Sequence, residues 1–489
     1  MVLLYYPQNT PPRLGRLPLS VLALAAVMDG KYDYRIVDGN VDRNAFHTVC
    51  QLFTSNHAIK VLAVSVMPGT QLMNAIQHCK QIKKLFPSVT IVWGGYFPSM
   101  HSDSVINTPY IDYVIRGQAE LSFLELLNKL ECGAQLNEVH NLSYRDNGTV
   151  QQNPEYPIYD PNLRPFFPYE KVHMDAYAIP TFIGTRTFCH ETSVGCPHKC
   201  NFCGVVDIFH SRWKAETVDR TIDTVRLLKD KYGMDGIEFH DSEFFVSEKR
   251  VTELSHKLID LDIQWWSEGR IDTLLSYDRE TWKLMERSGL RMIFFGAESG
   301  LNETLQLMDK GGVTIEKTKE IAARCKEYNI QSEFSFVMGA NPTRTEEDID
   351  ATIQLMYELE RINPKSQMHP FIYTPVPFGT IYDQAVEGGL RYPNSLDEWE
   401  QHEWQQYTLR QNPHTPWLTR RLYNKIVNFR AVHQCYFPKT NDRIIARWKL
   451  SLIKALSSWR YKLRFFTGAV ESRLLLRLFI NRASANESF

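Results

Sequence analysis

Short apolar segments alternate with longer amphipathic segments in two separate runs of the chain, and this alternation restricts the fold more than any other feature. The first run covers about the first 130 residues, and the second extends from about residue 182 to residue 390. Parallel strands need a crossover connection, usually a helix, so this alternation predicts parallel sheets covered by helices. We therefore predict an α/β fold, with an N-terminal doubly wound parallel sheet, a partial (β/α)6 barrel and a helical C-terminal region.

In the first run, the carboxyl ends of the predicted strands carry small or polar residues. The expected strands are 2–6, 34–37, 61–66, 89–93 and 111–115, and the expected helices are 17–28, 71–85 and 120–130. Asp38, Ser65, Gly94, Gly95 and Gly117 stand at or just after strand ends. Ligands of doubly wound sheets bind at this edge, and glycine lets the backbone approach them closely. The pattern indicates a ligand site, and the alternative is that these are ordinary strand-to-helix turns.

The second run contains six strand–helix units. The expected strands are 182–190, 236–240, 265–267, 292–296, 332–339 and 367–373, and the expected helices are 216–231, 247–260, 278–288, 302–309, 315–328 and 344–360. A parallel sheet of this length is typical of a partial barrel, in which chemistry takes place at the carboxyl ends of the strands.

Proline content separates the two runs. Prolines 154, 157, 161, 165, 168 and 180 exclude a helix or a central strand from this stretch. We therefore predict a first domain over residues 1–135, a Pro-rich linker over 136–181, the barrel over 182–390 and the helical C-terminal region over 391–489.

Charge and hydropathy exclude several classes of protein. The net charge of −1 gives no global basicity for binding nucleic acid. No stretch has the roughly 18 consecutive apolar residues that a membrane-crossing helix needs. The apolar run Leu17 to Met28 resembles a signal peptide, but cleavage near Ala26 would remove the first predicted strand. Nine cysteines, an odd number in a long chain, are not a disulfide framework, so we expect a cytoplasmic protein.

The C-terminal tail is basic and amphipathic. Residues 443–482 contain ten lysines and arginines against one acid, Glu471, and many apolar residues. Such a tail can lie on an anionic membrane, which predicts peripheral membrane contact. The alternative is a solvated helix that packs on the barrel.

Three cysteines near the start of the barrel carry the chemistry. Cys196, Cys200 and Cys203 are spaced as CxxxCxxC, so their thiolates can surround one small metal centre. A structural zinc site needs four protein ligands; no fourth cysteine follows closely, and His198 lies too near in sequence to complete a tetrahedron. A [4Fe-4S] cluster held by three cysteines leaves one iron open for a ligand. A zinc site or a purely structural cluster is the alternative.

This triplet after a first barrel strand resembles the signature of the radical S-adenosylmethionine (SAM) superfamily, CxxxCxΦC with an aromatic residue at Φ. Phe202 occupies that position. The resemblance implies that each cysteine ligates one iron, that SAM chelates the fourth iron, and that Phe202 packs near the adenine. Reduction of the cluster by an external one-electron donor would then yield methionine and a 5′-deoxyadenosyl radical.

Five later segments also resemble the family, in the expected order. They are 237–245, 268–272, 296–300, 336–346 and 375–380. The resemblance implies cofactor contacts for Asp241, Glu243, Arg270, Glu298, Ser299 and Gly339. Ser242 stands where the family usually has a second Asp, which leaves that contact open. Glu298 or Arg270 could instead form an ordinary ion pair within the barrel.

The first domain resembles the cobalamin-binding domains fused to radical enzymes, on segments 92–99 and 112–120. Phe97 replaces a usual His and Gln118 a usual Glu. Asp38-Gly39-Asn40 lacks the His that ligates cobalt in some relatives, so the resemblance implies histidine-off cobalamin near Asp38, Ser65, Gly94, Gly95 and Gly117. The alternative is a domain that has kept its sheet and lost the corrinoid.

The resemblance therefore implies a cobalamin-dependent radical SAM enzyme that methylates an unactivated carbon. One SAM would supply the methyl group to cobalamin, and a second would supply the radical that abstracts hydrogen from the substrate. We expect a small-molecule or lipid-like substrate and no nucleic acid. The alternatives are a radical cyclase, rearrangement or oxidative enzyme of the same fusion family, and a non-catalytic metal-binding protein.

Overall fold

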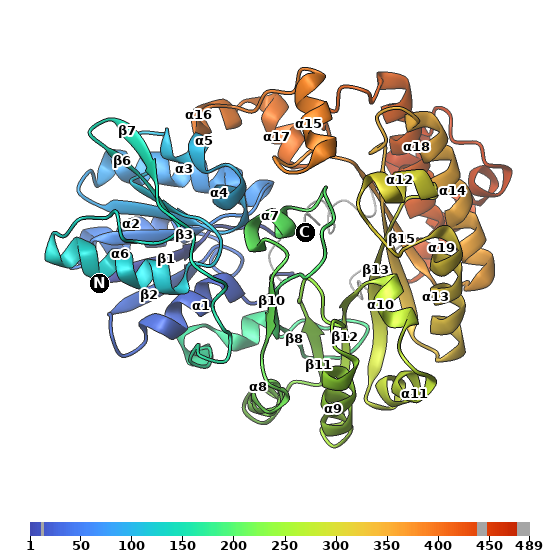
Figure 1. Cartoon of the computed structure of the whole chain (residues 1–489), viewed down its shortest axis with the longest axis horizontal. Coiled ribbons are helices and arrows are strands. Elements are labelled where there is room, and N and C mark those ends of the chain that lie inside the picture. Colours follow the sequence, from blue (N-terminus) through green and yellow to red (C-terminus); the bar gives the residue numbers. More distant parts are fainter. Residues whose placement is uncertain (11–13, 438–446, 477–489) are drawn as a thin grey trace.

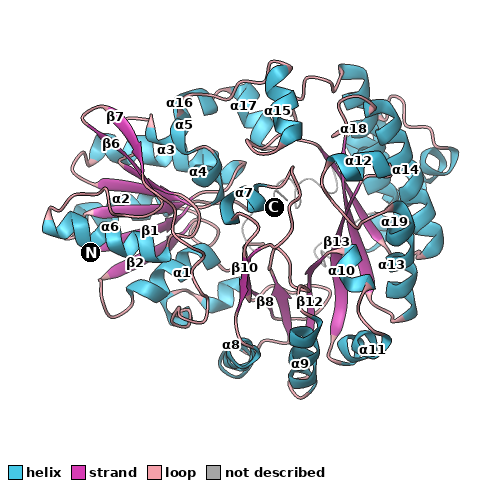
Figure 2. Ribbon diagram, viewed as in Figure 1, coloured by secondary structure: helices cyan, strands magenta, loops and turns pink. Residues whose placement is uncertain are grey.

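The computed structural model describes residues 1–10, 14–437 and 447–476. Two sheets form its framework, with the first sheet on the left of Figure 1 and the second below and to the right of the centre. Figure 2 shows that helices cover the outer surfaces of both sheets. The predicted α/β architecture, with a doubly wound sheet, a six-stranded parallel sheet and a helical C-terminal region, is confirmed.

The first sheet has the strand order β2-β1-β3-β4-β5-β6-β7. Its strands are β1 (Val2–Tyr6), β2 (Tyr34–Asp38), β3 (Val61–Ser65), β4 (Thr90–Gly94), β5 (Tyr113–Ile115), β6 (Leu142–Asp146) and β7 (Thr149–Gln152). The first five strands are parallel, and β1 pairs with both β2 and β3. The order therefore reverses at β1, the position beside which doubly wound sheets bind ligands.

Helices cover both faces of the first sheet. They are α1 (Leu19–Met28), α2 (Ala45–Ser55), α3 (Thr70–Leu85), α4 (Tyr96–Met100), α5 (Ser102–Ile106) and α6 (Glu120–Cys132). Each face has its own buried cluster, because side chains of successive strand residues point to opposite faces. Helices α2, α4 and α5 were not among the helices predicted from the sequence; α4 and α5 are only five residues long.

The second sheet is parallel throughout, with the strand order β15-β14-β13-β12-β11-β8. Its strands are β8 (Thr187–His190), β11 (Gly236–Phe239), β12 (Gln264–Gly269), β13 (Leu290–Glu298), β14 (Gln331–Met338) and β15 (Gln367–Ile372). Its helices are α8 (Val218–Tyr232), α9 (Glu248–Ile259), α10 (Ile271–Leu275), α11 (Arg279–Arg287), α12 (Asn302–Leu307), α13 (Ile315–Glu327) and α14 (Thr345–Ile362). All six predicted strands are present, so the partial barrel is confirmed.

The segment predicted as a linker begins as part of the first sheet. The hairpin of β6 and β7 continues that sheet, because β6 pairs antiparallel with β5. The proline-rich remainder carries only the short 3-10 turns Tyr169–Lys171 and Met174–Tyr177 before β8 begins. Proline prevents regular pairing there but not burial, since Phe167, Tyr169 and Tyr177 lie in the barrel core.

The helical C-terminal region divides between the two domains. Helices α15 (Thr380–Glu387), α16 (Leu396–Trp399) and α17 (His402–Thr408) contribute Trp399 and Tyr407 to the core of the first sheet. Helix α18 (Arg420–Tyr436) instead packs in the barrel core, and α19 (Arg447–Leu463) and α20 (Val470–Leu475) pack on α18. Figure 1 shows α15 to α17 at the top, between the first sheet and the barrel.

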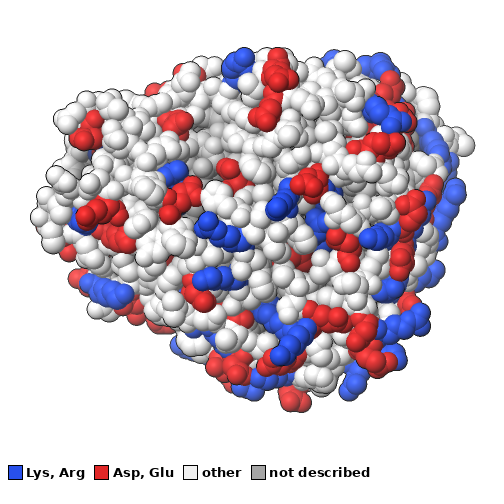
Figure 3. All heavy atoms as spheres, viewed as in Figure 1, with Lys and Arg blue, Asp and Glu red and all other residues white. Residues whose placement is uncertain are grey.

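Among the described residues, no helix is both long and apolar enough to cross a bilayer. Figure 3 shows acidic and basic side chains mixed with one another, mainly in the lower part and at the right of the face in view.

Candidate active site at the facing sheet edges

The loop between β9 (Ser193–Gly195) and α7 (Gly204–Phe209) holds the three clustered cysteines. All three thiols are free; Cys200 is buried, and Cys196 and Cys203 are half-buried. The pKa of Cys196 is raised to about 12, mainly by burial and to a smaller extent by nearby groups that include the other two thiols. Thiols with raised pKa values are protonated at neutral pH, so metal binding to this loop must release protons.

The chemistry of this donor set fits an iron–sulfur cluster. Within residues 1–10, 14–437 and 447–476, no three His, Cys, Asp or Glu side chains converge as the ligands of one metal ion would. The three thiols are nevertheless near enough to interact electrostatically. Separate thiolates that each hold a different iron atom of one cluster need this looser arrangement. Arg270 contributes positive charge, since its Nη1 lies 3.3 Å from Sγ of Cys200.

The cysteine loop is attached to two neighbouring loops through Asn201. The backbone N–H of Asn201 donates to the carbonyl of Met308 at 3.1 Å, and its side-chain amide donates to Leu307 at 2.7 Å and to Thr380 at 3.0 Å. Gly379 has a φ of +84°, and a Cβ there would lie 1.9 Å from the carbonyl oxygen of Asn201. Glycine is therefore required for this close approach.

Glu298 and Phe202 meet at a buried lysine. The ammonium of Lys310 lies 2.6 Å from Oε1 of Glu298 and 5.9 Å from the centroid of the Phe202 ring. Glu298 has a φ of +59°, an uncommon conformation for a residue other than glycine that is found preferentially at functional sites. The structure thus shows the ion pair considered from the sequence, and it places that pair beside the cysteine loop.

Asp241 and Glu243 differ in what they can still bind. Asp241 is fully buried, and its carboxylate accepts hydrogen bonds from Thr192 N–H at 3.1 Å, from the Thr192 hydroxyl at 2.8 Å and from Ser193. It therefore anchors the strand that leads to Cys196. Glu243 accepts only from Phe245 N–H, at 3.2 Å, among the described residues, and burial raises its pKa to about 8. Glu243 thus retains acceptor capacity for a ligand.

Ser299 and Gly339 directly follow strands β13 and β14. The Ser299 hydroxyl donates to Asp348 and accepts from Leu301 N–H at 2.9 Å. Gly339 has a φ of +81°, and its carbonyl accepts from Trp417 at 2.9 Å. Both residues hold turns at the same edge of the barrel.

The predicted residues of the first sheet gather at its carboxyl edge. Ser65 lies 2.8 Å from the Ser20 hydroxyl, and Gly117 N–H donates to Ser99 at 2.8 Å. Gly95 has a φ of +100°, and a Cβ there would lie 3.0 Å from Val66 backbone atoms, whereas Gly94 has more room. Asp38 accepts from the Tyr177 hydroxyl at 2.6 Å, and burial raises its pKa to about 6.

This edge faces the cysteine loop directly. Helix α4 packs on α7, and a Cβ on Gly204 would lie 2.2 Å from the Tyr96 hydroxyl oxygen. Arg16 makes a two-point contact with Glu238 of β11, at 2.5 and 3.0 Å. A cavity of about 150 Å³ lies beside α7, lined by residues of both domains such as Gly117 and His210. The two strand edges that carry the predicted site residues therefore face each other.

Two family models match the chain at these two domains. Residues 17–127 match the B12 binding domain, and residues 190–356 match the radical SAM superfamily. The chain joins a B12-binding domain to a radical SAM domain. The resemblance stated from the cysteine spacing and the strand-end segments is confirmed.

Known proteins are similar to this chain over most of its length. An uncharacterized methyltransferase of Pyrococcus horikoshii is 28% identical over 378 residues, which are 76% of this chain and 79% of the relative. The anaerobic magnesium-protoporphyrin IX monomethyl ester cyclase of Synechocystis sp. is 24% identical, over 76% of this chain and 73% of the relative. The structure of the cobalamin-dependent SAM radical enzyme OxsB, with aqua-cobalamin and SAM bound, superimposes with a TM-score of 0.70 at 17% identity, over 99% of this chain and 75% of OxsB.

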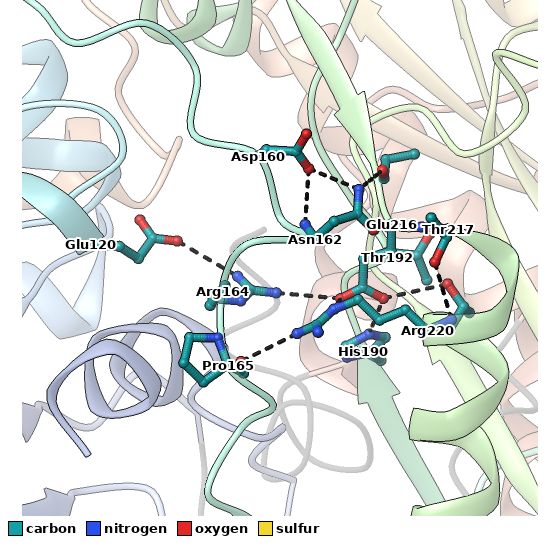
Figure 4. A network of polar contacts seen from close by, with 12 residues as sticks. Glu120, Asp160, Asn162, Arg164, Pro165, His190, Thr192, Glu216, Thr217 and Arg220 are labelled. Carbon is teal, nitrogen blue, oxygen red and sulfur yellow. Dashed lines mark hydrogen bonds and ion pairs between the residues drawn. The ribbon is translucent and has the colours of Figure 1, made fainter. Parts of the chain in front are cut away.

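Sequence reasoning did not find the polar network that joins the B12-binding domain to the radical SAM domain (Figure 4). Arg164, from the proline-rich segment, lies 3.6 Å from Glu120 at the start of α6 and 3.7 Å from Glu216, which follows β10 (Trp213–Ala215). Glu216 also contacts His190 at 3.0 Å and Arg220 at 3.2 Å. An isolated arginine in a proline-rich segment belongs to no local sequence pattern that would predict a contact between domains.

The roles of Lys310 beside Glu298 and of Tyr96 beside Gly204 were also not predicted from the sequence. Lys310 is buried, and it stands in the turn Asp309-Lys310-Gly311-Gly312 after α12. The sequence pattern of a lysine followed by two glycines predicts an exposed turn residue, because lysine is almost never fully buried unless it is paired. Lys310 reaches Glu298 because the chain returns from α12 to the end of β13.

Proposed function

We propose that this chain is a cobalamin-dependent radical SAM methyltransferase that acts on an unactivated carbon of a small molecule. The observation that carries the proposal is the contact between the carboxyl edge of the first sheet and the cysteine loop, through Tyr96 and Gly204. Methyl transfer requires a methyl carrier on the first domain to stand close to the carbon radical formed at the barrel. An α4–α7 contact supports that proximity.

When bound, the cluster, SAM and cobalamin would supply a carbon-centred radical and a transferable methyl group. Cys196, Cys200 and Cys203 would hold the cluster, and Arg270 stabilises the Cys200 thiolate by its charge. For SAM we propose Phe202, Glu243, Arg270, Glu298, Ser299 and Gly339, with Asp241 acting through the strand it anchors. For histidine-off cobalamin we propose Asp38, Ser65, Gly94, Gly95 and Gly117. The proline-rich segment contributes Tyr156, Pro157 and Ile158 to the cavity between the two domains.

We expect full-length protein, reconstituted anaerobically with iron, sulfide and hydroxocobalamin and supplied with an external one-electron reductant, to retain about one corrinoid per chain. With SAM labelled in its methyl group, the label is expected to enter the product. A converted product without label would favour the alternative, a cyclisation or rearrangement, which is the activity named for the Synechocystis relative. Retained iron without corrinoid would contradict the assignment of the first domain.

Strand pairing determines the domain limits that we propose. We propose that the first domain extends through the β6–β7 hairpin to Gln152, because β6 pairs with β5. The linker then comprises the proline-rich stretch up to Pro180, and the barrel begins with β8.

We also propose that α19 contacts the cytoplasmic surface of an anionic membrane. Trp448, Leu452, Leu456, Trp459 and Leu463 follow one another at three or four residues and are 45–73% exposed. This spacing places them on one side of the helix. Lys454, Lys462 and Arg464 are exposed nearby, and Glu471 is paired with Arg460. An apolar stripe flanked by positively charged side chains is typical of helices that lie on anionic lipid.

Replacing Trp459 and Leu463 together by serine should reduce co-sedimentation with phosphatidylglycerol-containing vesicles by about tenfold, since about 25 cal/mol of transfer free energy is lost per Å² of apolar surface. The matched control is Leu85→Ser, which changes an apolar residue 59% exposed at the end of α3. Equal binding by the double variant and the control, or equal binding to purely zwitterionic vesicles, would contradict membrane contact.

A further inference from the structure

The barrel sheet has one apolar face and one polar, aromatic face. Alternate residues such as Ile237, Trp265 and Phe295 belong to the buried core under the outer helices. The residues between them point to the opposite face, because side chains alternate along a strand. Six of these inward residues, from five strands, are Glu238, Trp266, Glu268, Phe294, Glu333 and His369.

The inward side chains contact one another across the strands. The rings of His240 and Trp266 are 5.7 Å apart between centroids, and those of Phe294 and His369 are stacked at 6.0 Å. His369 also stacks on Phe371 at 6.4 Å. Two groups of rings therefore line the inner face from β11 to β15, one beside β11 and β12 and one on β13 and β15, and most of their members keep part of their surface exposed. We call this face the aromatic wall.

Three carboxylates stand on this wall, and they differ in how they are compensated. Glu238 has the two-point contact with Arg16, and Glu333 lies 3.0 Å from Nε2 of His369. Among the described residues, no hydrogen bond or ion pair reaches the carboxylate of Glu268. Burial raises the pKa of Glu268 to about 7; His240 lowers it, and the carboxylates of Asp241 and Glu333 raise it. Glu268 thus lies between β11 and β14 without a cation of its own.

An uncompensated carboxylate in a partly desolvated site is unfavourable unless a ligand supplies the opposite charge. Aromatic faces beside it favour the same kind of ligand, because the face of an aromatic ring attracts cations and planar groups. The carboxylate of Glu268 and the aromatic rings beside it thus both favour a cationic, planar ligand at the carboxyl edge of β12, two residues before Arg270.

We infer that the substrate carries a protonated amine or guanidine group on an aromatic or other planar scaffold, and that Glu268 binds this cation while the aromatic wall holds the scaffold. This inference rests on the proposed function in that the wall lies inside the proposed active site. It names the substrate class, which the methyl-transfer proposal leaves open.

The test measures binding rather than turnover, so that it is independent of methyl transfer. Reconstituted full-length protein saturated with SAM is dialysed against 2-(1-naphthyl)ethylamine or 1-naphthaleneacetic acid, a matched pair that differs mainly in the sign of its charge. The fluorescence of naphthalene reports the bound fraction. We expect the amine to bind at least about tenfold more tightly than the acid.

Glu268→Gln should remove this preference and leave the affinity for SAM unchanged. Glu280→Gln is the matched control, because the Glu280 side chain is 80% exposed on the outer helix α11. Retained iron and corrinoid content verifies that each variant is folded. A Trp266→Leu variant should weaken binding of both probes, because it removes a ring but no charge.

Three results would overturn the inference: equal binding of the two probes, an unchanged preference in Glu268→Gln, or a loss of SAM affinity in that variant, which would make Glu268 a cofactor contact. A failure of the proposed function looks different. If the amine preference depends on Glu268 but no methyl label reaches a product, the substrate class stands and the reaction type is wrong.

Discussion

Replacing Cys200 by alanine is expected to abolish iron and sulfide incorporation and reductive cleavage of SAM. Cys200 is the buried member of the triplet, and Arg270 donates to its sulfur. In the proposed arrangement each of three cysteines holds one iron and SAM holds the fourth. Without Cys200, one further iron has no ligand from the protein, so the cluster is not retained. Formation of 5′-deoxyadenosine should fall by at least about a thousandfold, which corresponds to roughly 4 kcal/mol of barrier.

The matched control is Cys189→Ala. Cys189 lies on β8 near the triplet, is 1% exposed, and is separate from the loop. Its replacement should cost about 1–2 kcal/mol of unfolding free energy through lost packing, with iron content unchanged. The two variants are compared by iron content, measured by colorimetry, and by formation of 5′-deoxyadenosine, measured by chromatography. Cleavage by Cys200→Ala at the wild-type rate, or loss of iron in Cys189→Ala, would show that the cluster is held elsewhere.

Replacing Arg164 by methionine is expected to separate the two domains. The Arg164 side chain is 3% exposed, stacks over Phe167 at 4.4 Å from the ring centroid, and links Glu120 to Glu216. Methionine keeps much of the apolar stem but leaves the buried Glu120 without its cation. Breaking one side of a buried charge network costs about 3–5 kcal/mol. The urea midpoint should fall, and the proline-rich segment should become sensitive to protease.

Arg226→Met provides the comparison, because Arg226 is 55% exposed and its contact with Asp223 is 3.7 Å long. Its effect should stay within about 0.5 kcal/mol. Separation of the domains should also reduce methyl transfer more than SAM cleavage, since the barrel retains the cysteine loop. An unchanged midpoint in Arg164→Met, or equal loss of both activities, would show that the network does not hold the domains together.

Much of the site could be predicted because its residues stand at fixed points of a repeating pattern. Gly94 was predicted because a parallel strand ends beside it, and Glu298 and Gly339 were predicted because their segments resemble the radical SAM family. All three stand at the carboxyl edge of their own sheet. The cysteine triplet was found because its ligands lie close together in the sequence. In both cases, a contact in space follows from local periodicity or spacing.

Contacts between distant segments could not be predicted in this way. Lys310, Tyr96 and Arg164 carry no local pattern, and their partners lie from 12 to more than 100 residues away or on another domain. Asp241 was predicted to contact the cofactor, and the structure adds its hydrogen bonds with Thr192 and Ser193, which no local pattern indicated. The residue type at a strand end does not determine which neighbouring groups form hydrogen bonds with its side chain.

The sequence by itself determined the two runs of strands and helices, the order of the domains and the identity of the cysteine loop, because periodicity and ligand spacing are local properties of the chain. Only the tertiary structure decided that β6 and β7 extend the first sheet, that the C-terminal helices divide between two cores, and that the two sheet edges face each other. These outcomes depend on how preformed elements pack, and packing is set by the shapes and charges of surfaces assembled from distant residues.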